Sequence, residues 1–74
     1  MINYEYTDTF GGEANYCWVQ RGEVKANDLK HALRLARKEL GLTGCRGDIT
    51  VHCGDMLAWK PRNSCTILFV NWEY

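Results

Sequence analysis

The chain has 74 residues, with nine acidic and nine basic side chains that cancel to a formal net charge of zero. This length predicts a single domain, residues 1–74, near the lower limit for a self-sufficient core. The neutral total excludes a strong overall attraction to nucleic acid or to acidic membranes. No apolar stretch approaches the roughly 20 residues of a membrane span, and the first residues lack a secretory signal. We therefore expect a cytoplasmic protein whose four cysteines are thiols.

The first part of the chain predicts two antiparallel strands. Residues 2–7 alternate between apolar and polar side chains, which is typical of a strand with one covered face. Residues 8–12 end in two glycines, which permit the positive φ angles of a chain reversal. Residues 14–21 then predict the second strand. Strand alternation would place Tyr16 and Trp18 on one face of it.

The segment from Asn27 to Leu42 predicts the only helix. Asn27 is a suitable N-cap, because its side-chain oxygen can accept from the free amides of the first turn. Gly41 is suited to end the helix in the left-handed conformation, after which Leu42 can fold back onto the last turn. The apolar residues at helical spacing form one stripe for packing on a sheet. They are Leu29, Ala32, Leu33, Ala36 and Leu40.

Three more strands are predicted after the helix. In residues 48–53 the pattern alternates again, which predicts that Ile49, Val51 and Cys53 point inward. Gly54 and Asp55 fit a two-residue hairpin turn of type II′, with glycine first. Residues 56–60 form the returning strand, which the following proline ends. Residues 65–72 are the most continuously apolar run and predict a strand buried on both faces.

The predicted order is therefore ββαβββ. One helix of this length can cover one face of a sheet of four or five strands, but it cannot cover both faces. The expected fold class is α+β, a two-layer sandwich with one helix on one face of a mainly antiparallel sheet. The second face of that sheet is expected to be open.

The cysteines and histidines could in principle hold a metal or carry out catalysis. Structural zinc usually needs two close ligand pairs, and the spacings between Cys17, Cys45, Cys53 and Cys65 provide none. We expect these cysteines to be buried or half-buried thiols. No sequence pattern ties either histidine to a cysteine, and there is no glycine-rich phosphate loop. We predict no catalytic residues, no metal and no cofactor, with a small structural zinc domain as an alternative.

The predicted helix also has a basic face opposite its apolar stripe. It is formed by Lys30, Arg34, Arg37 and Lys38. A face of this kind often serves only solubility. Its functional interpretation is contact with phosphates or with an acidic protein surface. Four cations would give at most about four phosphate contacts, and therefore a modest and strongly salt-dependent affinity.

The aromatic content is high for so small a chain, with three Trp and four Tyr. A core of this size cannot hide all of them, so we expect about half to line the sheet face that the helix leaves open. Exposed Trp and Tyr dominate binding hot spots, and this makes Tyr16 and Trp18 candidate contact residues. The alternatives are stacking of single-stranded bases, a second small aromatic cluster, or a homodimer interface.

Residues 2–21 (INYEYTDTFGGEANYCWVQR) resemble the openings of short accessory proteins carried by prophages and plasmids. The compact build and the lack of catalytic apparatus are similar to those of anti-CRISPR proteins, small inhibitors of RNA-guided nucleases. That family has no common motif, so no functional residue is carried over. Many of its members are acidic and mimic DNA. A neutral chain with a basic helix instead favours direct contact with a protein.

The resemblance implies a small non-enzymatic inhibitor that binds a larger host protein or nucleoprotein, such as a CRISPR effector. We expect it to act by steric blocking, with no membrane partner. The expected contact residues are Lys30, Arg34, Arg37, Lys38, Tyr16 and Trp18. The alternative from another class is a small nucleic-acid-binding module that uses the basic helix face.

Overall fold

The computed structural model describes residues 2–11, 13–62 and 64–72. Gly12 of the predicted first turn and Tyr74 of the predicted aromatic set lie outside the described residues. Within the described residues the chain forms five strands and one helix in the predicted order ββαβββ. These elements are β1 (Ile2–Phe10), β2 (Glu13–Val24), α1 (Leu29–Glu39), β3 (Gly47–Cys53), β4 (Met56–Pro61) and β5 (Thr66–Trp72).

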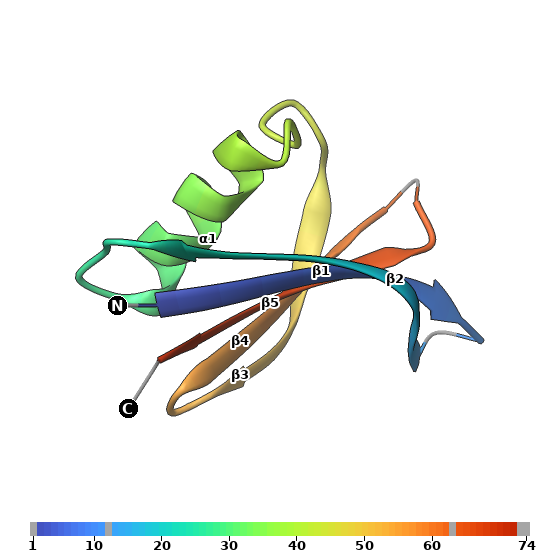
Figure 1. The fold of residues 1–74 in the computed structure, drawn as a ribbon, viewed down its shortest axis with the longest axis horizontal. Coiled ribbons are helices and arrows are strands. Elements are labelled where there is room, and N and C mark those ends of the chain that lie inside the picture. The colour runs from blue at the N-terminus through green and yellow to red at the C-terminus, as the bar shows by residue number, and fades with distance from the viewer. Residues whose placement is uncertain (1, 12, 63, 73–74) are drawn as a thin grey trace.

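The strands form one antiparallel sheet in the spatial order β2-β1-β5-β4-β3, with α1 against one of its faces (Figure 1). The predicted α+β class is confirmed. Strand β5 lies at the centre of the sheet, between β1 and β4, and most of its side chains are buried. Leu68 and Val70 are fully buried towards the helix, and Ile67 is also buried although it points to the other face. In the described part of the chain no helix is long and apolar enough to cross a membrane.

Helix α1 is shorter than predicted at both ends. Its N-cap is Asp28 and not Asn27, since the Asp28 carboxylate accepts from the His31 amide at 2.7 Å. The predicted stop at Gly41 is confirmed by its φ of +74°. The Leu42 amide donates to the Arg37 carbonyl and the Gly41 amide to the Lys38 carbonyl, which together make a Schellman motif. The predicted stripe is confirmed too, with four of its members buried: Leu29, Ala32, Leu33 and Ala36.

The aromatic residues are distributed differently from the prediction. Tyr4 and Trp59 are buried in the core beneath α1, and Tyr6 and Trp72 pack against that core. The expectation that about half of the Trp and Tyr side chains line the open face is therefore wrong. Strand pairing explains this, because Ile2, Tyr4 and Tyr6 alternate onto the helix side together with their partners on β5. Phe69, which alternates with Leu68 and Val70, faces the other side.

Strand β3 also departs from the prediction. A bulge at Thr50 shifts the register from Ile49↔Trp59 to Val51↔Ala58, so that Ile49 and Val51 lie on opposite faces. Because β3 is also an edge strand, these side chains remain 44% and 38% exposed, and their predicted inward packing is wrong. The two-residue connection between β3 and β4 is confirmed, but Gly54 has no positive φ, so the turn is not of type II′.

Candidate interaction surfaces

The β1–β2 hairpin carries an irregular segment near its tip. The pairing steps from Thr7↔Val19 to Thr9↔Ala14, so residues 15–18 of β2 lie opposite Asp8 alone. The extra residues cannot all join the ladder and are pushed out of the strand. As a result, the predicted regular alternation of Tyr16 and Trp18 does not hold. Within the bulge Tyr16 has a φ of +56°, a left-handed conformation that is uncommon for a residue other than glycine.

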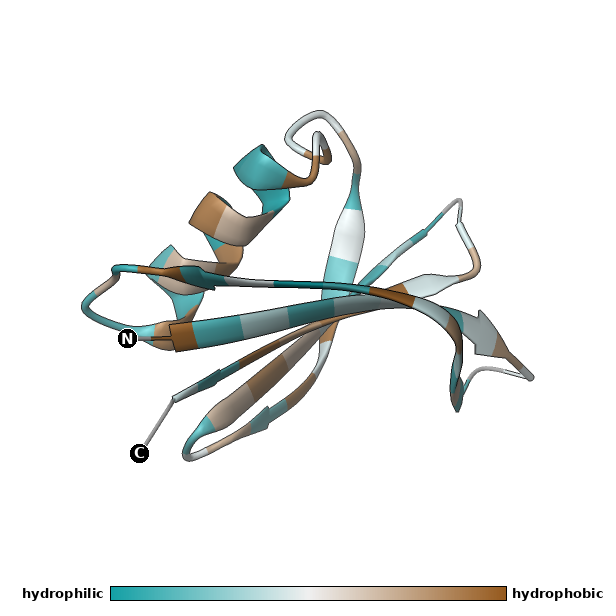
Figure 2. Ribbon diagram, in the orientation of Figure 1, coloured by the Kyte–Doolittle hydropathy of each residue, from teal (hydrophilic) through white to brown (hydrophobic). Residues whose placement is uncertain are grey.

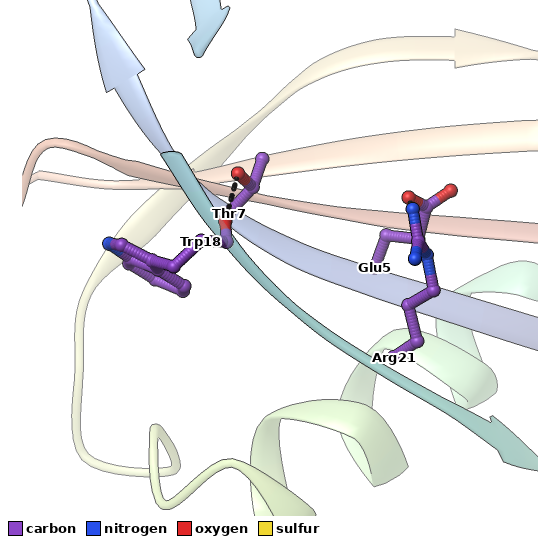
Figure 3. A network of polar contacts seen from close by, with 4 residues as sticks. All are labelled: Glu5, Thr7, Trp18 and Arg21. Atoms are coloured by element: carbon purple, nitrogen blue, oxygen red, sulfur yellow. Dashed lines mark hydrogen bonds and ion pairs between the residues drawn. The ribbon is translucent and has the colours of Figure 1, made fainter. Parts of the chain in front are cut away.

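Asp8 holds this bulge in place. One oxygen of its carboxylate accepts from the Cys17 amide at 2.9 Å, and the other accepts from the Asn15 side-chain amide at 3.0 Å. The hydrogen bond from Asn15, followed by that from the Cys17 amide, keeps the pKa of the Asp8 carboxyl below its usual value. The Thr7 hydroxyl also donates to the Trp18 carbonyl at 2.7 Å (Figure 3). The bulge is thus fixed at both of its ends.

Three exposed aromatic side chains lie at this end of the hairpin, which we call the aromatic hairpin end. Phe10 is 80%, Tyr16 51% and Trp18 42% exposed. An apolar segment is visible at the hairpin tip, drawn brown at the far right (Figure 2). The Trp18 ring is not free on all sides, because it meets the Tyr6 ring edge-on with centroids 5.4 Å apart. Phe10 was not among the predicted contact residues, although its position beside the turn glycines indicated an exposed side chain.

The basic face of α1 is only partly available. Lys30, Arg34 and Lys38 are exposed, and none of them has an ion pair within the described residues. Arg37, the fourth residue expected to contact a partner, instead makes internal contacts. Its guanidinium lies 4.4 Å from the centroid of the Trp59 ring. It also donates to the carbonyls of Leu42, Thr43 and Cys45, the last at 2.6 Å.

The structure does not bring the predicted contact residues together. In Figure 1 helix α1 lies in the left half of the molecule and the tip of the β1–β2 hairpin lies at the right; the longest dimension of the molecule is 31 Å. The two surfaces are therefore separate candidates.

The residues considered for metal binding or catalysis are dispersed. All four cysteines are exposed, so their predicted burial is wrong. No group of three or more His, Cys, Asp or Glu side chains in the described residues could hold a metal ion. One cavity of about 460 Å³ is lined in part by Cys45, and a cavity of about 270 Å³ is lined in part by His52. Neither of these two cavities combines a cysteine with a histidine.

Comparisons of this chain with protein-family models, with curated proteins and with solved structures gave no match.

Proposed function

We propose that this protein is a small non-enzymatic inhibitor that binds a larger protein or nucleoprotein through the aromatic hairpin end and blocks it sterically. The observation that supports this proposal is the exposure of Phe10, Tyr16 and Trp18 at one end of the molecule. Large exposed aromatic side chains are costly to leave in water, and they supply most of the energy at binding hot spots.

The contacts beneath these side chains indicate that the hairpin end is ordered, which favours a role in binding. Three hydrogen bonds of 2.7–3.0 Å made by Asp8 and Thr7 hold the residues on both sides of Tyr16: one with the Asn15 side chain and two with the backbone of Cys17 and Trp18. An interface that is already ordered loses less conformational entropy when it binds. The left-handed Tyr16 fits the same interpretation, because strained residues are retained where the surrounding structure and the function require them.

The most concrete form of this proposal is an anti-CRISPR protein that binds a CRISPR effector in the cytoplasm. Its basis is the resemblance of residues 2–21 to the openings of short accessory proteins of prophages and plasmids, and of the compact build to anti-CRISPR proteins. The exposed cations Lys30, Arg34 and Lys38 lie on α1, outside the aromatic hairpin end. We therefore assign them, at most, to steering a partner with an acidic or phosphate-rich surface.

The test compares binding by the parent chain and by Trp18→Ala and Tyr16→Ala, with the parent used as bait in host lysate and against purified CRISPR effector complexes. Trp18→Ala keeps the backbone carbonyl that Thr7 binds, so the bulge should persist. Ile49→Ala is the matched control, because Ile49 is 44% exposed against 42% for Trp18 and lies on the opposite edge strand.

We expect either aromatic substitution to weaken capture and inhibition by at least about tenfold, which corresponds to about 1.4 kcal/mol. Ile49→Ala should behave as the parent. Equal binding by all four proteins would contradict the proposed surface. Binding without any effect on nuclease cleavage would contradict the anti-CRISPR form and leave the aromatic contact standing.

A second candidate function is nucleic-acid binding through α1. It is favoured by the three exposed cations that lack ion pairs in the described residues, Lys30, Arg34 and Lys38. Three phosphate contacts predict that log K falls with log salt at a slope of about −2 to −3. Arg34→Glu together with Lys38→Glu should abolish such binding, whereas Trp18→Ala should not change that slope. Arg37 is left unchanged in this test because of its internal contacts.

A further inference from the structure

The strand β2 has an unpaired outer edge. It lies at the end of the sheet and pairs only with β1 among the described residues. The segment from Val19 to Val24 is free of bulges, with a continuous register from Thr7↔Val19 to Ile2↔Val24. A long regular edge of this kind exposes a row of amide and carbonyl groups and can accept another strand.

Alternation along β1 identifies the groups that point outward. The Thr9 amide donates to the Cys65 carbonyl, so the odd-numbered residues of β1 direct their backbone groups towards β5. The even-numbered residues then face β2, and they lie opposite Gln20, Gly22 and Val24. By the same alternation Val19, Arg21 and Glu23 direct their amides and carbonyls away from the sheet.

We propose that two copies of this chain pair antiparallel along these β2 edges, about a two-fold axis at Gly22, to form one continuous sheet. In this register Arg21 lies opposite Glu23 of the second copy, and Glu23 lies opposite Arg21 of the second copy. Both pairs join residues whose backbone groups point outward, as an antiparallel ladder requires. Both side chains also lie on the face away from the helix, so each cross-strand pair unites opposite charges.

The charges already present on that face support this register. Arg21 donates to the Glu5 carboxylate at 3.2 Å and remains 67% exposed (Figure 3). A second carboxylate, from Glu23 of the other copy, would approach the guanidinium from the open side of the strand. Arg21 would then lie between two carboxylates, and its five donors are sufficient for both.

The other edge strand is less suited to pairing. In β3 the bulge at Thr50 places Ile49 and Val51 on opposite faces. It therefore interrupts the row of backbone amides and carbonyls that point away from the sheet. Beside β2, by contrast, there is room on the helix side. A groove of about 490 Å³ lies between β2 and α1, and its lining includes Val24 and Leu35. Leu35 is only half-buried there, and an added strand would cover it.

The test is sedimentation equilibrium of the full chain over a range of concentrations. We expect the parent to reach twice its 8.5 kDa mass as concentration rises. Arg21→Glu and Glu23→Arg each place like charges across the axis, so each should raise the dissociation constant at least about tenfold. When the two variants are mixed, opposite charges face each other again, and the mixture should associate as a heterodimer.

Glu13→Arg is the matched control, because it makes the same charge change on β2 but beyond the bulge, and it should dimerise as the parent does. Circular dichroism and thermal melting establish that each variant is folded. Glu23→Arg remains informative even if Arg21→Glu is disturbed by its neighbour Glu5. A parent that stays at 8.5 kDa to millimolar concentration, or a Glu23→Arg variant that dimerises normally, would overturn the proposal.

Amide exchange measured by NMR provides an independent readout. In the dimer the amides of Arg21 and Glu23 should become protected as the concentration rises. Those of Gln20 and Gly22 should be protected at every concentration, because they pair with β1. Protection of Arg21 and Glu23 that does not depend on concentration would also contradict the proposed pairing.

Discussion

The guanidinium of Arg37 covers the ring of Trp59, with 4.4 Å between its central carbon and the ring centroid. This contact joins the last turn of α1 to β4, a strand distant in the sequence. The same guanidinium donates to three carbonyls of the loop between α1 and β3. One side chain thus ties together the helix end, the sheet and the connecting loop, close to the negative end of the helix dipole.

We predict that Arg37→Ala destabilises the protein by about 1–3 kcal/mol, because it removes a cation–π contact and the hydrogen bonds to three loop carbonyls. Arg37→Lys should recover only part of this loss, since an ammonium lacks the planar fork of donors. Arg34→Ala is the control on the exposed face and should change stability by less than about 0.5 kcal/mol. Urea unfolding measures all three. Equal urea midpoints for Arg37→Ala and Arg34→Ala would show that the internal contacts of Arg37 contribute nothing to stability.

Gly22 leaves room for the ring of Tyr4, which lies across it. A Cβ atom at position 22 would lie 2.5 Å from that ring. We therefore predict that Gly22→Ala costs about 1–3 kcal/mol, although alanine is normally the better strand residue. In a Tyr4→Leu background the penalty should largely disappear, which a double-mutant cycle by thermal melting can measure. Gly44→Ala is the control, because its Cβ would meet nothing within 4 Å.

The bulge should depend on pH through Asp8. Its folded-state pKa lies below the usual value of 3.8, chiefly because of the Asn15 hydrogen bond. The ionised carboxylate therefore stabilises the fold above that usual value, and the stabilisation disappears as pH falls through the lower folded pKa. We expect the parent to be more stable than Asp8→Asn at neutral pH and to lose this advantage in acid. Urea midpoints across this range measure the difference, and Asp55→Asn is the control. An advantage that stays constant into acid would contradict this role.

The core contact of α1 can be tested at Leu33, which is 7% exposed. Leu33→Ala should cost about 2–5 kcal/mol, enough to unfold much of so small a protein. Leu35→Ala should cost less, because Leu35 is only half-buried beside β2. Denaturant titration compares the two. A neutral Leu33→Ala beside an unfolding Leu35→Ala would mean that the helix is rotated from its described position.

Local patterns predicted most of the fold. The spacing of the leucines and alanines identified the buried stripe of α1, and Gly41 identified its end, because both signals act within one or two turns. The N-cap was predicted one residue too early, at Asn27 instead of Asp28, since both side chains can accept from the first amides. The bulges in β2 and β3 were not predicted either. That in β2 depends on Asp8, a residue on the neighbouring strand.

The candidate surfaces were predictable only in part. A helical wheel places Arg37 near Arg34 and Lys38. It contains no information about other elements, so it cannot predict that the long side chain of Arg37 reaches Trp59. Likewise, strand alternation assigns Tyr4 and Tyr6 to one face without telling whether that face meets the helix. Both answers come from pairings between distant segments, which no local window contains.

The central seam of the sheet joins its first and last strands, with Ile2 opposite Trp72. The hairpins β1–β2 and β3–β4 can each form locally, but no strand of one hairpin pairs with a strand of the other. They are connected only through β5, which pairs with β1 on one side and with β4 on the other. Such long-range closure is slow compared with the formation of a helix or a hairpin. During synthesis, residues 2–65 would emerge as two unconnected hairpins and an unsupported helix. We expect the core to close only after residues 66–72 have left the ribosome.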